Sequence, residues 1–188
     1  MIILLNGPPN CGKDTIAKII KKKIGSKDYK MSKPIKEAFS ALFGIQGQLL
    51  HELLEERKDE AFFTANANIT PREVLIKLSE DFMKPLFGDD CFGQVAVNNL
   101  GKIAWKHLTI SDCGFNAEVP PIAKAYGCDK VKAILIDRPG YEWDSRERLD
   151  CDTIGIEGTW LMNHYDLELL DAQVNRRLRL WGLLDDRS

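Results

Sequence analysis

The sequence lacks the features that mark several large classes of protein. It has no apolar run of about 18 residues, the length that a membrane-spanning helix needs. Its first residues lack the basic region, apolar stretch and cleavage site of a secretory signal. Lysine and arginine do not outnumber the acidic residues, and the formal net charge of −2 supplies no overall attraction to nucleic acid or to an anionic membrane. We therefore expect a cytoplasmic protein that binds neither directly.

Cysteine and histidine are also few and scattered. The five cysteines lie far apart and show no Cys-x-x-Cys spacing, and the three histidines are equally dispersed. An odd number of isolated cysteines indicates no disulfide framework. The spacing also indicates no zinc site, so we expect no metal ligation by cysteine or histidine.

Internal repeats, low-complexity tracts and flexible linkers are missing too, so the 188 residues fit one domain. Short apolar runs alternate with helical patterns along the chain. The run at 2–6 is typical of a strand buried on both faces, and a helical pattern follows over 14–24. Two further strands are predicted at 105–111 and 131–137. This alternation predicts an α/β domain with a parallel sheet.

The remaining segments predict additional elements. Thr70 with Pro71 and Glu73 forms a capping box, so a helix is predicted to begin there and to continue to about residue 87. The other predicted elements are a strand near 28–32, helices over 34–43 and 48–63, a short helix within 117–127, a last strand within 151–158, and one or two helices from 159 onward.

A phosphate-binding pattern lies between the first strand and the first helix, in "GPPNCGKDT" at 7–15. Gly7 and Gly12 permit a backbone whose N–H groups point at phosphate oxygens, and Lys13 would bridge the outer phosphates. Asp14 stands where a serine or threonine usually completes the pattern, and Thr15 offers a hydroxyl one residue later. Two interpretations of Asp14 remain open: it complements the positive helix end, or it orients magnesium-bound water.

Two further residues suggest an anion site and a magnesium or proton-accepting group. Arg72 lies in the first turn of a helix, where a cation meets the unfavourable end of the dipole, so a shared phosphate would relieve the conflict. The alternative is an arginine extended into water. Asp112 follows an apolar strand, at the sheet edge where ligands bind, and could hold magnesium through water or accept a proton. Its alternative is a helix cap.

Arginines gather in the turn-prone stretch "RPGYEWDSRER" at 138–148. Phosphoryl transfer spreads negative charge over oxygens that arginines on a closing segment can neutralise, and this suggests a role for Arg138, Arg146 or Arg148. The acidic residues of the same stretch favour the other interpretation, a solvated loop of ion pairs. The sequence does not rank the three arginines.

With these motifs in view, the chain resembles the deoxynucleoside monophosphate kinases of bacteriophage type, within the P-loop nucleoside monophosphate kinase superfamily. The resemblance rests on "GPPNCGKDT", "SKPIKEAFSALFG", "TPREVLIKLSEDF" with "GDDCF", "DCGFNAEV", "RPG" and "CDTIGIEGT". It implies a P-loop fold of five parallel strands flanked by helices, with an acceptor-binding helical region at about 33–100 and a short lid at about 138–150. It also implies ATP and magnesium as cofactors and, for a phage-encoded protein, a location in the host cytoplasm.

The resemblance assigns roles residue by residue. It implies that Lys33 and Lys36 lie near the acceptor, that Arg72 binds its phosphate, and that Arg138 begins the lid. Glu118 matches the family pattern, whereas Gly114 stands where an arginine is common, so one acceptor contact is missing or has moved. The donor phosphates would be held by Gly7, Asn10, Cys11, Gly12, Lys13, Asp14 and Thr15, with magnesium bound through water at Asp14, Thr15 and Asp112.

The leading prediction is therefore an enzyme that transfers the γ-phosphoryl group of ATP to a nucleoside monophosphate. Two alternatives remain: a P-loop kinase for another small metabolite, and a nucleotide-binding switch or assembly protein that transfers no phosphate. A kinase needs a second anion site, for which Arg72 and the arginines of 138–148 are candidates. The sequence leaves open which base and sugar are accepted, and whether the protein is a homodimer.

Overall fold

The computed structural model describes residues 1–61, 68–144, 146–164 and 166–185. The chain divides into two compact units, which we describe separately. The first, which we call the sheet unit, comprises residues 1–31 and 92–188. The second, which we call the helical unit, comprises residues 32–91. No helix of the described ranges is both long enough and apolar enough to cross a membrane.

The sheet unit contains a five-stranded sheet in the order β2-β3-β1-β4-β5, and every pair of neighbouring strands is parallel. The prediction of an α/β fold with a five-stranded parallel sheet is thus confirmed. The central strand is the apolar run that the sequence placed before the phosphate loop. The strands are β1 (Ile2–Asn6), β2 (Lys27–Tyr29), β3 (Leu108–Ile110), β4 (Val131–Asp137) and β5 (Glu157–Met162).

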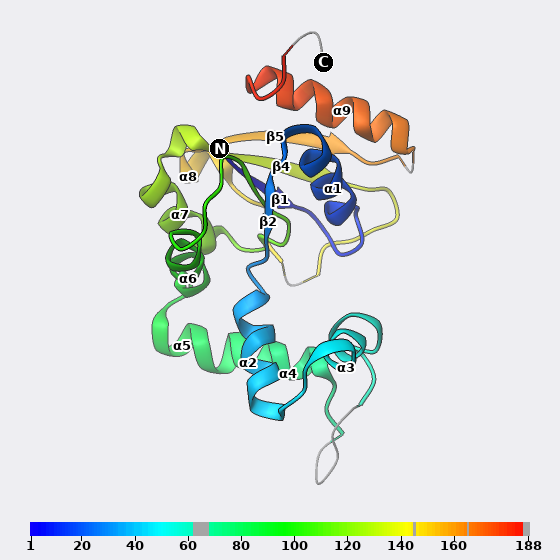
Figure 1. The fold of residues 1–188 in the computed structure, drawn as a ribbon, viewed down its shortest axis with the longest axis vertical. Helices are drawn as coiled ribbons and strands as arrows, with labels where there is room; N and C mark the ends of the chain where they lie inside the picture. Colours follow the sequence, from blue (N-terminus) through cyan, green and yellow to red (C-terminus); the bar gives the residue numbers. More distant parts are fainter. Residues whose placement is uncertain (62–67, 145, 165, 186–188) are drawn as a thin grey trace. The chain divides into compact units, whose positions relative to one another are not determined.

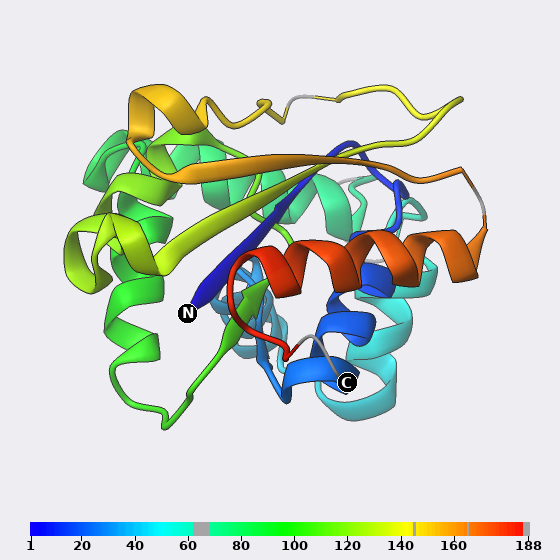
Figure 2. The ribbon, with the colours of Figure 1, turned by 90° about the horizontal axis from the view of Figure 1, so that it is seen from above.

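Helices cover both faces of this sheet (Figures 1 and 2). Alternate residues of a strand point to opposite faces, so Ile2 and Leu4 pack with α6 and α7, whereas Ile3 and Leu5 pack with α1 and α9. All four side chains are fully buried, which explains the continuous apolar run. The helices are α1 (Lys13–Ile24), α6 (Cys91–Leu100), α7 (Val119–Tyr126), α8 (Cys151–Ile154) and α9 (Leu167–Leu180), with 3-10 turns η3 (Asn116–Glu118) and η4 (Cys128–Lys130).

Two predictions about this unit were wrong. The segment predicted as the last strand begins instead with α8, because the Asp150 side chain accepts a hydrogen bond from the Thr153 N–H and caps a helical turn that Gly155 ends at a φ of 78°. The strand follows at 157–162, partly in residues predicted as helix. The bounds of α6 were not predicted, although it falls within the helical region that the resemblance implied at about 33–100. The strand predicted at 105–111 is confirmed but is limited to β3.

The described part of the helical unit contains α-helical segments, with one π-helical turn directly after α3 and another between α4 and α5. Thr70 forms the predicted capping box: its Oγ1 accepts from the Glu73 N–H at 3.2 Å, and its own N–H donates to Glu73 Oε2 at 2.8 Å. The helix predicted over 48–63 ends at Glu56 in the structure, and residues 62–63 lie outside the described ranges. The elements are α2 (Lys33–Phe43), α3 (Gly47–His51), η1 (Glu52–Glu56), α4 (Pro71–Lys77), η2 (Leu78–Met83) and α5 (Lys84–Phe87).

Candidate functional site

The loop between β1 and α1 has a backbone that requires its glycines. Gly12 has a φ of 105° and Asn10 a φ of 59°, both in the left-handed region. A Cβ on Gly12 would lie 2.5 Å from Asn163 Nδ2, and one on Gly7 would lie 2.7 Å from the Ile136 carbonyl oxygen. Side chains at either glycine would therefore break the loop. The loop therefore needs glycine at both positions, and phosphate binding by its N–H groups stays a prediction.

Two residues, one directly after β4 and one directly after β5, hold this loop by hydrogen bonds to its backbone. Asn163, which follows β5 and is 5% exposed, donates from Nδ2 to the Cys11 carbonyl at 2.9 Å and from its N–H to the Asp137 carbonyl at 2.8 Å. Arg138, which follows β4, donates from Nη1 to the Asn10 carbonyl at 2.8 Å. Sequence reasoning missed Asn163, because no motif marks a single asparagine 152 residues from its partner.

Lys13 folds back over the loop. Its Nζ donates to the Gly7 carbonyl at 2.7 Å and to the Pro8 carbonyl at 2.6 Å, and lies 3.6 Å from Cys11 Sγ. Burial lowers the pKa of Lys13, and the nearby charge of Arg146 lowers it further. Burial also raises the pKa of the Cys11 thiol, although Lys13 opposes that rise. Lys13 is therefore held by two backbone carbonyls of the loop.

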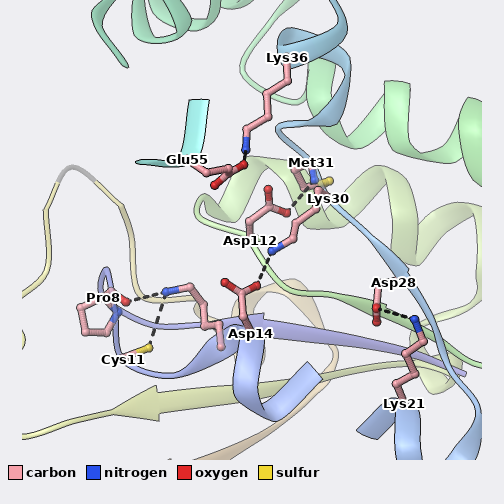
Figure 3. A network of polar contacts seen from close by, with 11 residues as sticks. Pro8, Cys11, Asp14, Lys21, Asp28, Lys30, Met31, Lys36, Glu55 and Asp112 are labelled. Carbon is pink, nitrogen blue, oxygen red and sulfur yellow. Dashed lines mark hydrogen bonds and ion pairs between the residues drawn. The ribbon is translucent and has the colours of Figure 1, made fainter. Parts of the chain in front are cut away.

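Asp14 forms an ion pair that the sequence did not suggest. Its Oδ1 lies 2.5 Å from Nζ of Lys30, the residue after β2 (Figure 3). Burial alone would raise the pKa of the Asp14 carboxyl, but Lys30, together with Lys13 and Lys18, outweighs it, and the pKa is lowered. Thr15, next to it in the first turn of α1, is half-buried. Asp14 therefore has a cationic partner besides the helix end.

Asp112 lies beyond β3 at the carboxyl edge of the sheet, where the sequence predicted it. Its Oδ1 accepts from the Met31 N–H at 2.7 Å, at the end of the neighbouring strand β2 (Figure 3). No group of three or more His, Cys, Asp or Glu side chains that could hold a metal ion occurs in the ranges that the structure describes. Magnesium in kinase sites usually needs only one or two carboxylates besides phosphate and water, so the donor types of Asp14 and Asp112 fit it.

The last residues of the predicted lid, 146–150, are held by hydrogen bonds to the end of β1 and to the segment after β3. Fully buried Asn6 donates from Nδ2 to the carbonyls of Cys113 at 3.0 Å and Glu147 at 2.9 Å, and its Oδ1 accepts from the Leu149 N–H at 3.1 Å. The Glu147 N–H also donates to the Gly114 carbonyl at 2.8 Å. The assignment of 138–150 as a lid stays a prediction, and the structure shows that Glu147 and Leu149 are hydrogen-bonded to Asn6 at the end of β1.

Arginines and aromatic rings meet beyond the ends of β4 and β5. The guanidinium of Arg138 lies over the Tyr141 ring, 4.6 Å from its centroid. That of Arg148 lies 4.7 Å from the centroid of Trp160 and 3.3 Å from Asp137. All of these side chains except Trp160 line an open cavity of about 450 Å³, which we call the aromatic cavity. Its lining residues are Asp137, Arg138, Pro139, Tyr141, Glu142, Trp143, Arg148 and Met162.

Arg146 packs on Gly114, the position where the resemblance leads one to expect an arginine. A Cβ on Gly114 would lie 3.3 Å from Arg146 Cγ, so the arginine stem covers the glycine. The Arg146 guanidinium also lies 3.6 Å from Asp144. Glu118, which is 4% exposed, accepts at Oε2 from the Gly114 N–H at 3.0 Å and the Phe115 N–H at 3.2 Å. Glu118 thus shapes the loop beneath Arg146.

The candidate cations of the helical unit are paired with acids. Arg72 donates to both carboxylate oxygens of Asp59, from Nε to Oδ1 at 2.5 Å and from Nη2 to Oδ2 at 3.2 Å. The Arg72 hydrogen bond lowers the pKa of Asp59. Asp59 therefore supplies an anion for the arginine that the helix dipole disfavours. The other pairs are Lys36 with Glu55 (Figure 3) and Lys33 with Glu37 at 3.7 Å. Acceptor binding by these residues stays a prediction.

Comparisons with known proteins yield distant structural likenesses only. No family model matches the chain, and no curated protein matches it. Among solved structures, shikimate kinase from Aquifex aeolicus is 14% identical, with a TM-score of 0.43 over 97% of this chain and 99% of that one. A sugar kinase from Janibacter sp. HTCC2649 is 11% identical, with a TM-score of 0.42 over 98% of each chain.

A dephospho-CoA kinase from Campylobacter jejuni is 14% identical, with a TM-score of 0.42 over 94% of this chain and 96% of that one. Identities and scores this low assign neither an activity nor a substrate to this chain.

Proposed function

We propose that this chain is a P-loop kinase that transfers the γ-phosphoryl group of ATP to a small molecule. The observation that carries the proposal is the loop between β1 and α1. It combines two glycines that cannot carry side chains with a left-handed turn and the start of a 12-residue helix. Lys13 rests there on neutral carbonyls, which a phosphate oxygen can replace. Such a loop presents backbone N–H groups and a cation to a polyphosphate.

The aromatic cavity supports a nucleotide as the donor. It lies beyond β4 and β5, from whose ends Arg138 and Asn163 fasten the phosphate loop. A base stacks favourably on aromatic rings and arginine planes, and Tyr141 and Trp143 provide such surfaces. We assign the base of the donor to this cavity and its phosphates to the loop. Bound magnesium would neutralise phosphate charge beside Asp14 and Asp112.

For the acceptor we propose a deoxynucleoside or ribonucleoside monophosphate. An oxygen of its phosphate would attack the γ-phosphorus while the bond to the β–γ bridging oxygen breaks, releasing ADP. Lys33, Lys36 and Arg72 are the proposed ligands of this phosphate, each exchanging a carboxylate partner for it. Arg146, the arginine of 138–148 that does not line the cavity assigned to the base and whose charge acts on Lys13, would neutralise the transferred group. This chemistry depends on positioning and charge, without a covalent intermediate on a side chain.

A second candidate is a kinase for another small hydroxylated or phosphorylated metabolite. The carboxylates that occupy Lys36 and Arg72 favour it, since an acceptor phosphate must compete with Glu55 and Asp59 for these cations. Gly114 also favours this second candidate, because it offers no side chain to a nucleoside monophosphate acceptor.

The test is an ADP-release assay with ATP and magnesium across all common nucleoside and deoxynucleoside monophosphates, with shikimate and simple sugars as the rival panel. We expect release to rise with at least one monophosphate, and to disappear in the Lys13→Ala variant. Stimulation by a rival acceptor alone would favour the second candidate. Nucleotide binding without stimulation by any acceptor would favour the non-catalytic switch or assembly protein.

A further inference from the structure

Lys30 is a charged residue beside the phosphate loop to which neither a motif nor the proposed reaction assigns a role. Its ammonium forms the 2.5 Å ion pair with Asp14, the residue directly after Lys13 (Figure 3). The pair joins the first turn of α1 to the end of β2, two elements of the same sheet unit.

The backbone holds Lys30 firmly in this place. Its neighbours Tyr29 and Met31 are 7% and 4% exposed and pack into the core on one face of the sheet. Because side chains alternate along an extended chain, Lys30 points to the opposite face, where α1 lies. The Met31 N–H is held by Asp112 at 2.7 Å. The buried side chains of Tyr29 and Met31 and the hydrogen bond of the Met31 N–H therefore direct Lys30 toward Asp14.

The ion pair itself is exposed, with 42% of the Lys30 side chain and 74% of the Asp14 side chain accessible. Exposed pairs of this kind contribute little to folding stability. Its larger effect is electrostatic and local. Asp14 places a negative charge in the helix turn whose N–H groups face a bound phosphate, and an uncompensated carboxylate there repels a polyphosphate.

We propose that Lys30 is a positioning residue of the phosphate site, which neutralises and holds Asp14 so that the loop accepts a nucleotide polyphosphate. Lys30 acts through Asp14 and does not itself contact the ligand. The inference rests on the proposed function, because it requires a nucleotide in the loop. Lys13 binds the phosphate, and Lys30 removes the repulsion next to it.

The test is a double-mutant cycle on ADP affinity, measured by calorimetry in EDTA so that no divalent cation can neutralise Asp14. We expect Lys30→Gln to raise the Kd for ADP about tenfold. We expect Asp14→Asn to bind ADP at least as tightly as the wild type, and the double variant to bind within about twofold of Asp14→Asn. Lys30→Arg, which keeps the charge, should stay within about threefold of the wild type.

Lys21→Gln is the matched control. It breaks a comparable exposed ion pair, Lys21 with Asp28 at 3.4 Å, which also joins α1 to β2 (Figure 3). Lys21 lies about 10 Å along the helix from Asp14, which is about one Debye length at physiological salt. We expect no change in the Kd for ADP. Thermal midpoints of both lysine variants should stay within about 2 °C of the wild type, which separates a binding effect from an effect on folding.

The outcomes separate the two proposals. An equal loss of affinity on Lys30→Gln in the wild-type and Asp14→Asn backgrounds would overturn the inference, because Lys30 would then act on the ligand without Asp14. An unchanged Kd on Lys30→Gln would overturn it as well. Failure of the wild-type protein to bind ADP or ATP at all would instead remove the proposed function.

Discussion

The two cations that contact the phosphate loop and the candidate cations of the helical unit differ in what they bind. In the sheet unit, Lys13 and Arg138 donate to backbone carbonyls of the phosphate loop. In the helical unit, Lys36 and Arg72 are paired with the carboxylates Glu55 and Asp59. A neutral carbonyl leaves the cation its charge for an incoming phosphate, whereas a carboxylate must be displaced first. Carboxylates also pair with the other two candidate arginines of the sheet unit, Arg146 with Asp144 and Arg148 with Asp137, so the contrast is between the phosphate loop and the helical unit.

The phosphate loop and the ion pairs of the helical unit also differ in how deeply their residues are buried. The loop of the sheet unit follows a fully buried strand, and its partner Asn163 is itself buried, so removal of that side chain leaves a polar group unsatisfied in the interior. The ion pairs of Arg72 and Lys36 lie at the surface of the helical unit, where such pairs are weak and exchange partners readily. Removal of a hydrogen-bonding side chain from the phosphate loop should therefore have a larger effect than removal of a charge from the helical unit.

The largest effect is expected for Lys13→Ala. Removal of the proposed phosphate-binding cation should lower kcat/KM for ATP by about a thousandfold. It should also lower the free energy of unfolding by about 1–3 kcal/mol, because the carbonyls of buried Gly7 and Pro8 lose their donor. Steady-state kinetics and a thermal melt measure the two quantities. Retention of more than about a tenth of the activity would mean that Lys13 is not the principal phosphate ligand.

The next effect is expected for Asn163→Ala, which removes the hydrogen bond to the Cys11 carbonyl. Because that carbonyl becomes unsatisfied in the interior, we expect a loss of about 1–3 kcal/mol in the free energy of unfolding. The Kd for ATP should also rise, because the phosphate loop loses the hydrogen bond that holds its Cys11 carbonyl. Asn98→Ala, at an exposed position of α6, is the control and should change neither quantity. Unchanged urea denaturation of Asn163→Ala would refute the fastening role.

A smaller effect is expected from the Arg72 and Asp59 pair, and it tests the comparison itself. Arg72→Ala should raise the KM of the acceptor about tenfold and leave that of ATP unchanged. Asp59→Asn weakens the competing ion pair, so the KM of the acceptor should fall by about threefold. Acceptor titrations at saturating ATP give both values. If neither variant alters the acceptor KM, Arg72 serves only its ion pair with Asp59.

The smallest effect is expected for Gly114→Ala. The new Cβ would lie 3.3 Å from Arg146 Cγ, and the flexible arginine stem can yield by a few tenths of an ångström. We expect kcat to change by about twofold, with no change in the KM of ATP. A bulkier Gly114→Leu should displace Arg146 and lower kcat by about tenfold if that arginine stabilises the transferred group. Equal kcat values for the wild type and Gly114→Leu would argue against a catalytic Arg146.

Local patterns were predicted well where neighbouring residues determine the structure. The apolar run of β1, the loop glycines and the capping box of Thr70 were all recognised, because each depends on residues within a few positions. The strand β5 was misplaced for the opposite reason. It lies at the sheet edge with Trp160 and Met162 exposed, so its pattern is not the alternation or the apolar run of an ordinary strand.

The sequence by itself determined the β1–loop–α1 unit, the parallel α/β fold and the residue types of the site. Only the tertiary structure decided which partners those residues meet: Asn163 for the loop, Lys30 for Asp14, Asp59 for Arg72 and Arg146 over Gly114. Hydrogen bonds and ion pairs depend on positions in space, and sheet pairing brings together carboxyl ends that lie far apart along the chain. The charge available to a phosphate depends on those partners, and so it could not be predicted from spacing.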